Sequence, residues 1–128
     1  MGGAQTPMER DWPEWLSKRR AAHRQQLQHE LERLTEVAAA VGVQLVVLFG
    51  SSSRGTAGLM SDLDLLVVWD TPLDFLARTV ELYRCLQPRV AVDLLVYTPA
   101  EMESMAHTPL VRRALAEGRV LYETRSFD

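Results

Sequence analysis

The longest regular pattern of apolar residues lies near the start of the chain and predicts a helix from Pro13 to Val41. Apolar residues recur there every three or four positions, which places them on one side of a helix. Gly42 follows as a typical C-terminal stop. The second half of this helix is expected to pack on the rest of the protein. The stripe consists of Leu16, Leu27, Leu31, Leu34, Ala38 and Val41.

Three short apolar runs rich in Val and Leu predict strands buried on both faces, at residues 44–49, 63–69 and 90–97. Residues 119–123 predict a fourth strand at an edge of the sheet. The expected fold is therefore α/β (α+β), with a small mixed sheet of about four strands, helices packed on one side and the long N-terminal helix added to it.

Three Thr-Pro pairs mark the expected starts of the remaining helices. Thr71 is predicted to cap a helix that ends near Leu86, Thr98 a second helix, and Thr108 a third that ends at Gly118. The apolar residues of the first of these helices are expected to be buried, namely Leu73, Leu76, Val80 and Tyr83.

The chain has 128 residues, which suits one domain with its own core. Residues 1–12 predict a loose tail and 13–128 a single domain, with the helix at 13–42 and the core at 43–123. The single cysteine, Cys85, suits a reducing compartment, and no apolar run is long enough to span a bilayer. We therefore expect a cytoplasmic protein without a membrane partner. The net charge of −3 gives no reason to expect direct nucleic-acid binding.

Candidate chemistry begins with two aspartates, Asp62 and Asp64, at the start of the second apolar run. Side chains of an extended strand alternate between faces, so these two carboxylates should project in the same direction. A third aspartate, Asp93, interrupts the apolar run at 90–97, where burial is costly unless it is paired or binds a metal. Three such carboxylates could share two Mg²⁺ ions about 4 Å apart, the arrangement used in phosphoryl transfer.

A Gly- and Ser-rich turn lies a few residues before this acidic pair and reads G-S-S-S-R-G from Gly50. Gly50 allows the backbone to approach a phosphate, and the hydroxyls and amides that follow, from Ser51 on, can bind an anion. Arg54 suits either a phosphate or a structural salt bridge. A turn of this kind is weak evidence when it stands alone.

The first half of the long helix carries a cluster of basic side chains, Lys18, Arg19, Arg20 and Arg24. A solvated helix face explains this cluster most simply. Docking of a partner, or of nucleic acid, remains an alternative for the same residues.

The run from Gly50 to Leu65 resembles the signature of the DNA polymerase β-type nucleotidyltransferase superfamily. That signature is G-S, two residues, R-G, and then S-D-x-D followed by an apolar strand. Asp93 in the later V-D-L strand matches the third carboxylate. The short chain is most similar to the minimal nucleotidyltransferase (MNT) group, although its N-terminal helix is longer than a minimal catalytic unit needs.

The resemblance implies the function. MNT proteins usually act as antitoxins of HEPN ribonuclease toxins, and transfer AMP from ATP to a tyrosine hydroxyl of the toxin. It implies a hetero-oligomer with a HEPN-type toxin, ATP as substrate and two Mg²⁺ ions. Two other functions stay open: an antitoxin that acts by binding alone, and nucleotidyl transfer to a small molecule such as an aminoglycoside. The resemblance assigns metal binding and catalysis to Asp62, Asp64 and Asp93, and nucleotide binding to Gly50, Ser51, Arg54 and Ser61.

Overall fold

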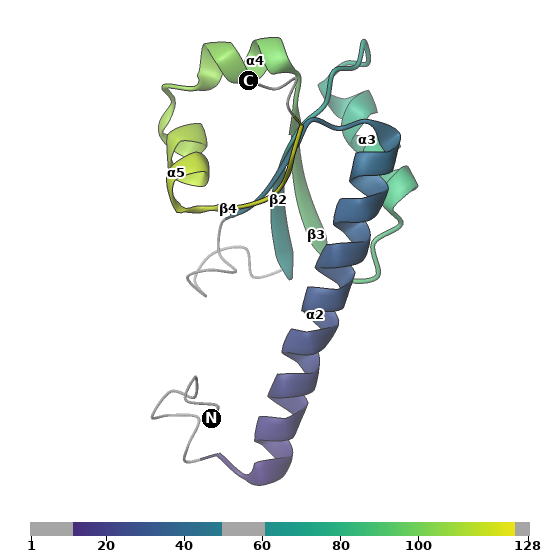
Figure 1. The fold of residues 1–128 in the computed structure, drawn as a ribbon, viewed down its shortest axis with the longest axis vertical. Helices are drawn as coiled ribbons and strands as arrows, with labels where there is room; N and C mark the ends of the chain where they lie inside the picture. The colour runs from purple at the N-terminus through teal and green to yellow at the C-terminus, as the bar shows by residue number, and fades with distance from the viewer. Residues whose placement is uncertain (1–11, 50–60, 125–128) are drawn as a thin grey trace.

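The computed structural model describes residues 12–49 and 61–124, and its elements follow the predicted order (Figure 1). The expected helices and strands are confirmed to within a few residues at each end. In chain order they are α2 (Glu14–Val41), β1 (Leu45–Phe49), β2 (Leu63–Val68), α3 (Phe75–Leu86), β3 (Val92–Tyr97), α4 (Pro99–Met105), α5 (Pro109–Glu117) and β4 (Arg119–Glu123).

The four strands form one mixed sheet in the order β3-β2-β1-β4. Strands β2 and β3 are parallel, and α3 makes the crossover between them. Strand β1 is antiparallel to both β2 and β4. The predicted α/β fold class is therefore confirmed, and the parallel pair β2–β3 carries the acidic residues of interest.

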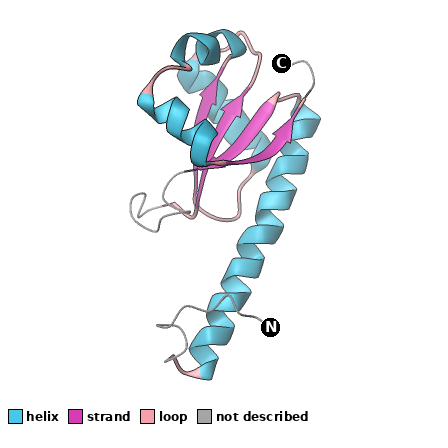
Figure 2. Cartoon of the chain, turned by 60° about the vertical axis from the view of Figure 1, so that its left-hand side comes forward, coloured by secondary structure: helices cyan, strands magenta, loops and turns pink. Residues whose placement is uncertain are grey.

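Helices cover both faces of the sheet, so the expected packing on one side is wrong (Figure 2). On one face, α2 and α3 pack against Leu65 and Val67 of β2. On the other, Met102 of α4 and Val111 of α5 pack against Leu66 and Val68. All six residues of β2 are buried, and a strand that is apolar on both faces needs cover on both.

Helix α2 divides into a packed half and a projecting half (Figure 1). Leu31, Leu34 and Ala38 are buried against the sheet, as the apolar stripe predicts. The helix ends at Gly42, whose φ of 98° is the left-handed conformation that favours glycine. Residues 18–26 are all exposed, so the basic half of α2 extends away from the core.

Helix α3 differs from the prediction in its start and in its buried face. Asp74, rather than Thr71, is the N-cap, and its Oδ1 accepts a hydrogen bond from the Ala77 N–H at 2.8 Å. The residues expected to be buried are exposed instead: Leu73, Leu76, Val80 and Tyr83. The buried face consists of Arg78, Leu82 and Leu86. Both sets of residues have helical spacing. Because the buried set contains an arginine, hydrophobicity alone did not identify it as the buried face of α3.

Among the described residues, no helix has both the length and the hydrophobicity needed to cross a membrane.

Candidate functional site

Asp64 and Asp93 lie side by side at the start of the two parallel strands. Asp64 pairs with Asp93 in the register of β2 and β3, and adjacent strands are about 4.8 Å apart. Asp64 is buried, with 6% of its surface exposed, whereas Asp93 is open to solvent. Residues in register on parallel strands share a face of the sheet, so the backbone itself places two carboxylates together.

This acidic pair belongs to the face that α4 and α5 cover farther along the strands. Leu66 and Val68 follow Asp64 at intervals of two residues and pack in the cluster that includes Met102. Tyr97 continues the Asp93 face of β3 into the same cluster. On this face of β2 and β3, the ends of the strands are therefore apolar and covered by α4 and α5, whereas their beginnings are acidic.

Asp62 precedes β2 and makes a different set of contacts. Its Oδ2 accepts a hydrogen bond from the Ala91 N–H at 3.1 Å, and its own N–H donates to the Ala91 carbonyl oxygen at 2.8 Å. The Asp64 Oδ1 accepts a hydrogen bond from the Ser61 hydroxyl at 2.9 Å. Within residues 12–49 and 61–124, no three acidic, histidine or cysteine side chains form a group that could hold a metal ion. The structure therefore places Asp64 beside Asp93, whereas Asp62 is hydrogen-bonded to Ala91, the residue just before β3.

The donor chemistry of the pair nevertheless suits a divalent cation. Carboxylate oxygens are the hard ligands that Mg²⁺ prefers, and two carboxylates this close repel each other unless a positive charge lies between them. The exposure of Asp93 leaves space for a substrate beside it. Of the predicted nucleotide-binding residues, Ser61 contacts Asp64, while Gly50, Ser51 and Arg54 lie outside the described residues.

A buried glutamate that sequence reasoning missed fixes the entry of β3. Glu30 of α2 is 5% exposed, and its Oε2 accepts a hydrogen bond from the Arg89 N–H at 2.6 Å. Arg33 binds the same carboxylate at 2.8 Å and donates to the carbonyl oxygens of Leu86 and Gln87. The bond from Arg33 is the main reason that the pKa of Glu30 is lowered, and burial opposes it. The pair ties α2 to the segment that leads into Asp93.

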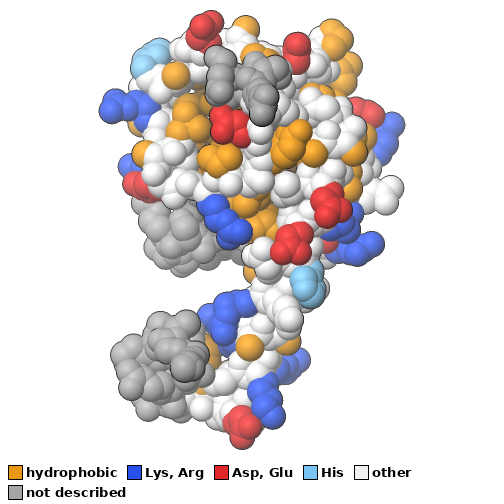
Figure 3. Space-filling view, viewed as in Figure 1, with side chains coloured by type: hydrophobic (Ala, Val, Ile, Leu, Met, Phe, Trp, Pro, Cys, Tyr) orange, Lys and Arg blue, Asp and Glu red, His pale blue; other side chains and the backbone are white. Residues whose placement is uncertain are grey.

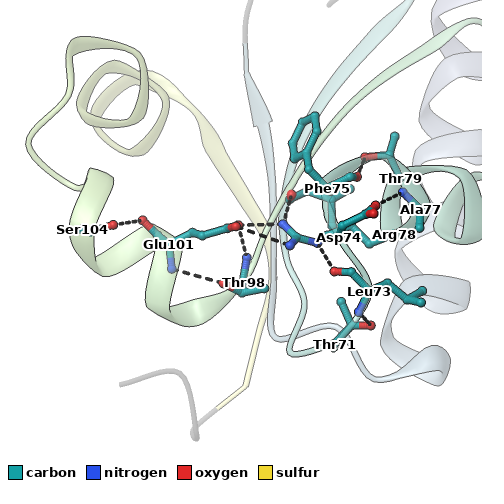
Figure 4. A network of polar contacts seen from close by, with 11 residues as sticks. Thr71, Leu73, Asp74, Phe75, Ala77, Arg78, Thr79, Thr98, Glu101 and Ser104 are labelled. Atoms are coloured by element: carbon teal, nitrogen blue, oxygen red, sulfur yellow. Dashed lines mark hydrogen bonds and ion pairs between the residues drawn. The ribbon is translucent and has the colours of Figure 1, made fainter.

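A second missed pair joins α3 to α4 at the far end of β3 (Figure 4). The buried Arg78 guanidinium binds Glu101 at 2.6 Å, and it also donates to the carbonyl oxygens of Val96 and Leu73. Glu101 completes a capping box with Thr98, so the predicted helix start at Thr98 is confirmed. The hydrogen bond from Arg78 is the main cause of the lowered pKa of Glu101.

The sequence carried a signal for each of these pairs. Glu30 and Arg33 have the i, i+3 spacing of a helical ion pair. Arg78 lies four residues before Leu82 and eight before Leu86, on the stripe that proves to be buried. In both pairs, a charged side chain forms hydrogen bonds with backbone groups of another element. These bonds position the strands and do not involve the reacting atoms.

Comparison with protein families gives a match to the nucleotidyltransferase domain over residues 25–122, more than half of the chain. The chain belongs to this nucleotidyltransferase family. The match spans the packed half of α2, the strands β1, β2 and β3 and most of β4, and it includes Asp62, Asp64 and Asp93. Among curated proteins, none matches the chain. Nucleotidyltransferases generally use a nucleoside triphosphate and a divalent metal, which agrees with the acidic pair at the start of β2 and β3.

Proposed function

We propose that this nucleotidyltransferase transfers AMP from ATP to a tyrosine hydroxyl of a HEPN-type ribonuclease toxin, in a Mg²⁺-dependent reaction. The observation that carries the proposal is the placement of Asp64 opposite Asp93 in a chain that matches the nucleotidyltransferase family. The resemblance of the G-S signature at Gly50 supports the proposal.

In the proposed reaction, the acceptor oxygen forms a bond to the α-phosphorus of ATP. The bond from that phosphorus to the oxygen bridging the α- and β-phosphates breaks, and pyrophosphate leaves with the bonding electrons. The hydroxyl proton passes to the carboxylate of Asp93, which is the exposed member of the pair. Asp64 and Asp93 would hold Mg²⁺, and Asp62 would join them on leaving the Ala91 amide; the ion would offset the negative charge that accumulates on the phosphates.

The other residues of the chain prepare this geometry. The Ser61 hydroxyl orients the Asp64 carboxylate, and the sheet register fixes the separation of Asp64 from Asp93. The Glu30–Arg33 pair holds the segment that precedes β3. A site supported by strands and by partly buried ion pairs is set before the substrate arrives, which reduces the reorganisation that catalysis requires.

The test is to incubate the protein with its cognate HEPN-type protein and Mg²⁺-ATP, and to measure the mass of the intact partner by mass spectrometry. We expect the partner to gain the mass of one AMP. The double variant Asp62→Asn with Asp64→Asn should abolish this gain. Asp70→Asn is the matched control, because Asp70 is an exposed aspartate just beyond the opposite end of β2.

Two outcomes would replace the proposal. If the double variant inhibits the ribonuclease activity of the partner as well as the unchanged protein does, the protein acts by binding. If the partner gains no mass while an aminoglycoside is adenylylated, the acceptor is a small molecule.

A further inference from the structure

A hollow lies where the projecting half of α2 leaves the sheet. It has a volume of about 480 Å³ and is formed by α2, by the lower ends of β1, β2 and β4, and by the end of α5. The volume is that of a site for a side chain or small ligand. Its apolar lining comes from Leu27, Leu31, Leu48 and Leu63, and its polar lining from Arg24, Gln28, Asp62, Glu117 and Arg119.

The rim of this hollow is basic on both sides. Arg24 comes from α2 and Arg119 from β4, and both are exposed. In the described part of the chain, no carboxylate forms an ion pair with either arginine. Figure 3 shows hydrophobic surface at the junction between the helix and the body, with basic side chains above and below it. Asp62 and Glu117 also line the hollow, so its lining is balanced in charge, and the excess of basic side chains lies on the exposed part of α2.

The projecting half of α2 extends this basic surface. Arg19 and Arg20 lie on it one to two turns before Arg24, and residues 18–26 are all exposed. The protein as a whole carries a net charge of −3, so these cations are a local exception. An exposed helical segment of this length gains little stability from its own hydrogen bonds, and packing against a partner would stabilise it.

The hollow adjoins the reacting edge of the sheet. Asp62 lines it, and Asp62 is two residues before Asp64, a separation of about 7 Å along an extended chain. The side chains of Asp64 and Asp93 project from the other face of the sheet, so a partner held in the hollow would reach them around the beginning of β2. The nucleotide alone would need neither a leucine floor nor a long basic helix beside it.

We propose that the hollow and the projecting half of α2 together bind the protein acceptor, through an apolar side chain flanked by acidic residues. The apolar side chain enters between Leu27 and Leu63, and acidic residues on either side pair with Arg24 and Arg119. This inference rests on the proposed transfer of AMP to a protein. RNA is the competing ligand for a basic helix, but the leucine floor and the acidic chain favour a protein.

The test is to measure the affinity of the cognate HEPN-type protein, without ATP, for charge-reversed variants. Arg24→Glu combined with Arg119→Glu should raise Kd at least tenfold, and the KM for the acceptor should rise similarly while kcat changes less than twofold. Arg113→Glu is the matched control, because Arg113 is an exposed arginine on α5, away from the hollow. Leu27→Ala should also raise Kd, with the thermal unfolding midpoint recorded to confirm folding.

Several results would overturn the inference, and they differ from a failure of the proposed function. If the partner gains AMP but the charge-reversed variant binds it as tightly as the Arg113→Glu control does, the acceptor docks elsewhere. If the same variant loses affinity for a single-stranded RNA and keeps its affinity for the protein, the basic surface binds RNA. If the unchanged protein adds no AMP to the partner, the proposed function itself is wrong, whatever the affinities are.

Discussion

Replacement of Arg78 by methionine tests how the two helices at the upper end of the sheet are held together. Methionine keeps most of the packing volume of the arginine stem but removes every donor. The side chain of Arg78 is 6% exposed, and its loss leaves the carbonyl oxygens of Val96 and Leu73 without this partner. Hydrogen bonds to a charged group are worth about 1.5–3 kcal/mol each when buried.

The contribution of Glu101 must be discounted, because its side chain is 41% exposed and water can replace the guanidinium. We therefore expect Arg78→Met to lower the free energy of unfolding by about 2–4 kcal/mol, mainly through the two carbonyls. For a chain of this size, that corresponds to a fall of roughly 10 °C in Tm.

The assay is urea unfolding followed by circular dichroism, with thermal unfolding in parallel. Arg84→Met is the matched control on the same helix, because Arg84 is 74% exposed and lies 3.6 Å from Glu81. Its effect should stay below about 0.5 kcal/mol. If Arg78→Met unfolds at the same urea concentration as Arg84→Met, the buried guanidinium does not stabilise the fold and the reasoning is refuted.

Three further predictions concern pH, packing and the site. Because the pKa of Glu101 is lowered from its usual 4.5, its ion pair stabilises the protein fully above pH 4.5 and less at lower pH. The difference in the free energy of unfolding between the unchanged protein and Glu101→Gln should therefore shrink on acidification. A difference that stays constant with pH in urea unfolding would contradict this. Gly118→Ala should cost about 2 kcal/mol, because a Cβ would lie 2.6 Å from Val47 Cγ1; unchanged urea unfolding would refute the close packing. Asp93→Asn should abolish AMP transfer yet shift Tm by under about 2 °C, since Asp93 is exposed; residual transfer above a tenth of normal would remove its catalytic role.

The sequence predicted the elements of this fold well because its signals are local. Glycine after the long helix and Thr-Pro pairs before the short ones mark their ends, and the structure confirms Gly42 and the Thr98 capping box. The start of α3 was misplaced because Thr71 and Asp74 are both good caps, and only the tertiary structure selects between them.

Burial was harder to predict than secondary structure. Leu76 and Val80 form a convincing apolar stripe, yet α3 turns Arg78, Leu82 and Leu86 inward. Hydrophobicity alone cannot place a buried arginine, because the acceptors that make its burial tolerable come from distant segments. The same is true of Glu30, whose backbone partner is 59 residues away.

For the candidate site, the spacing of the aspartates was informative but incomplete. The proximity of Asp64 and Asp93 depends on the register of β2 and β3, which no local pattern gives. The alternation rule also placed Asp62 with Asp64, but Asp62 precedes the strand and its carboxylate binds the Ala91 amide. The polar turn from Gly50 to Arg54 lies outside the described residues, so its assignment to the nucleotide stays a prediction.

The central claim, that this site transfers a nucleotidyl group, is tested most directly by the position of the label that reaches the acceptor. The protein and its HEPN-type partner would be incubated with Mg²⁺ and ATP that is radiolabelled on either the α- or the γ-phosphate. We predict that the α-label alone becomes attached to the partner, and that the variant Asp64→Asn with Asp93→Asn attaches neither. Attachment of the γ-label would show phosphoryl transfer and contradict the account.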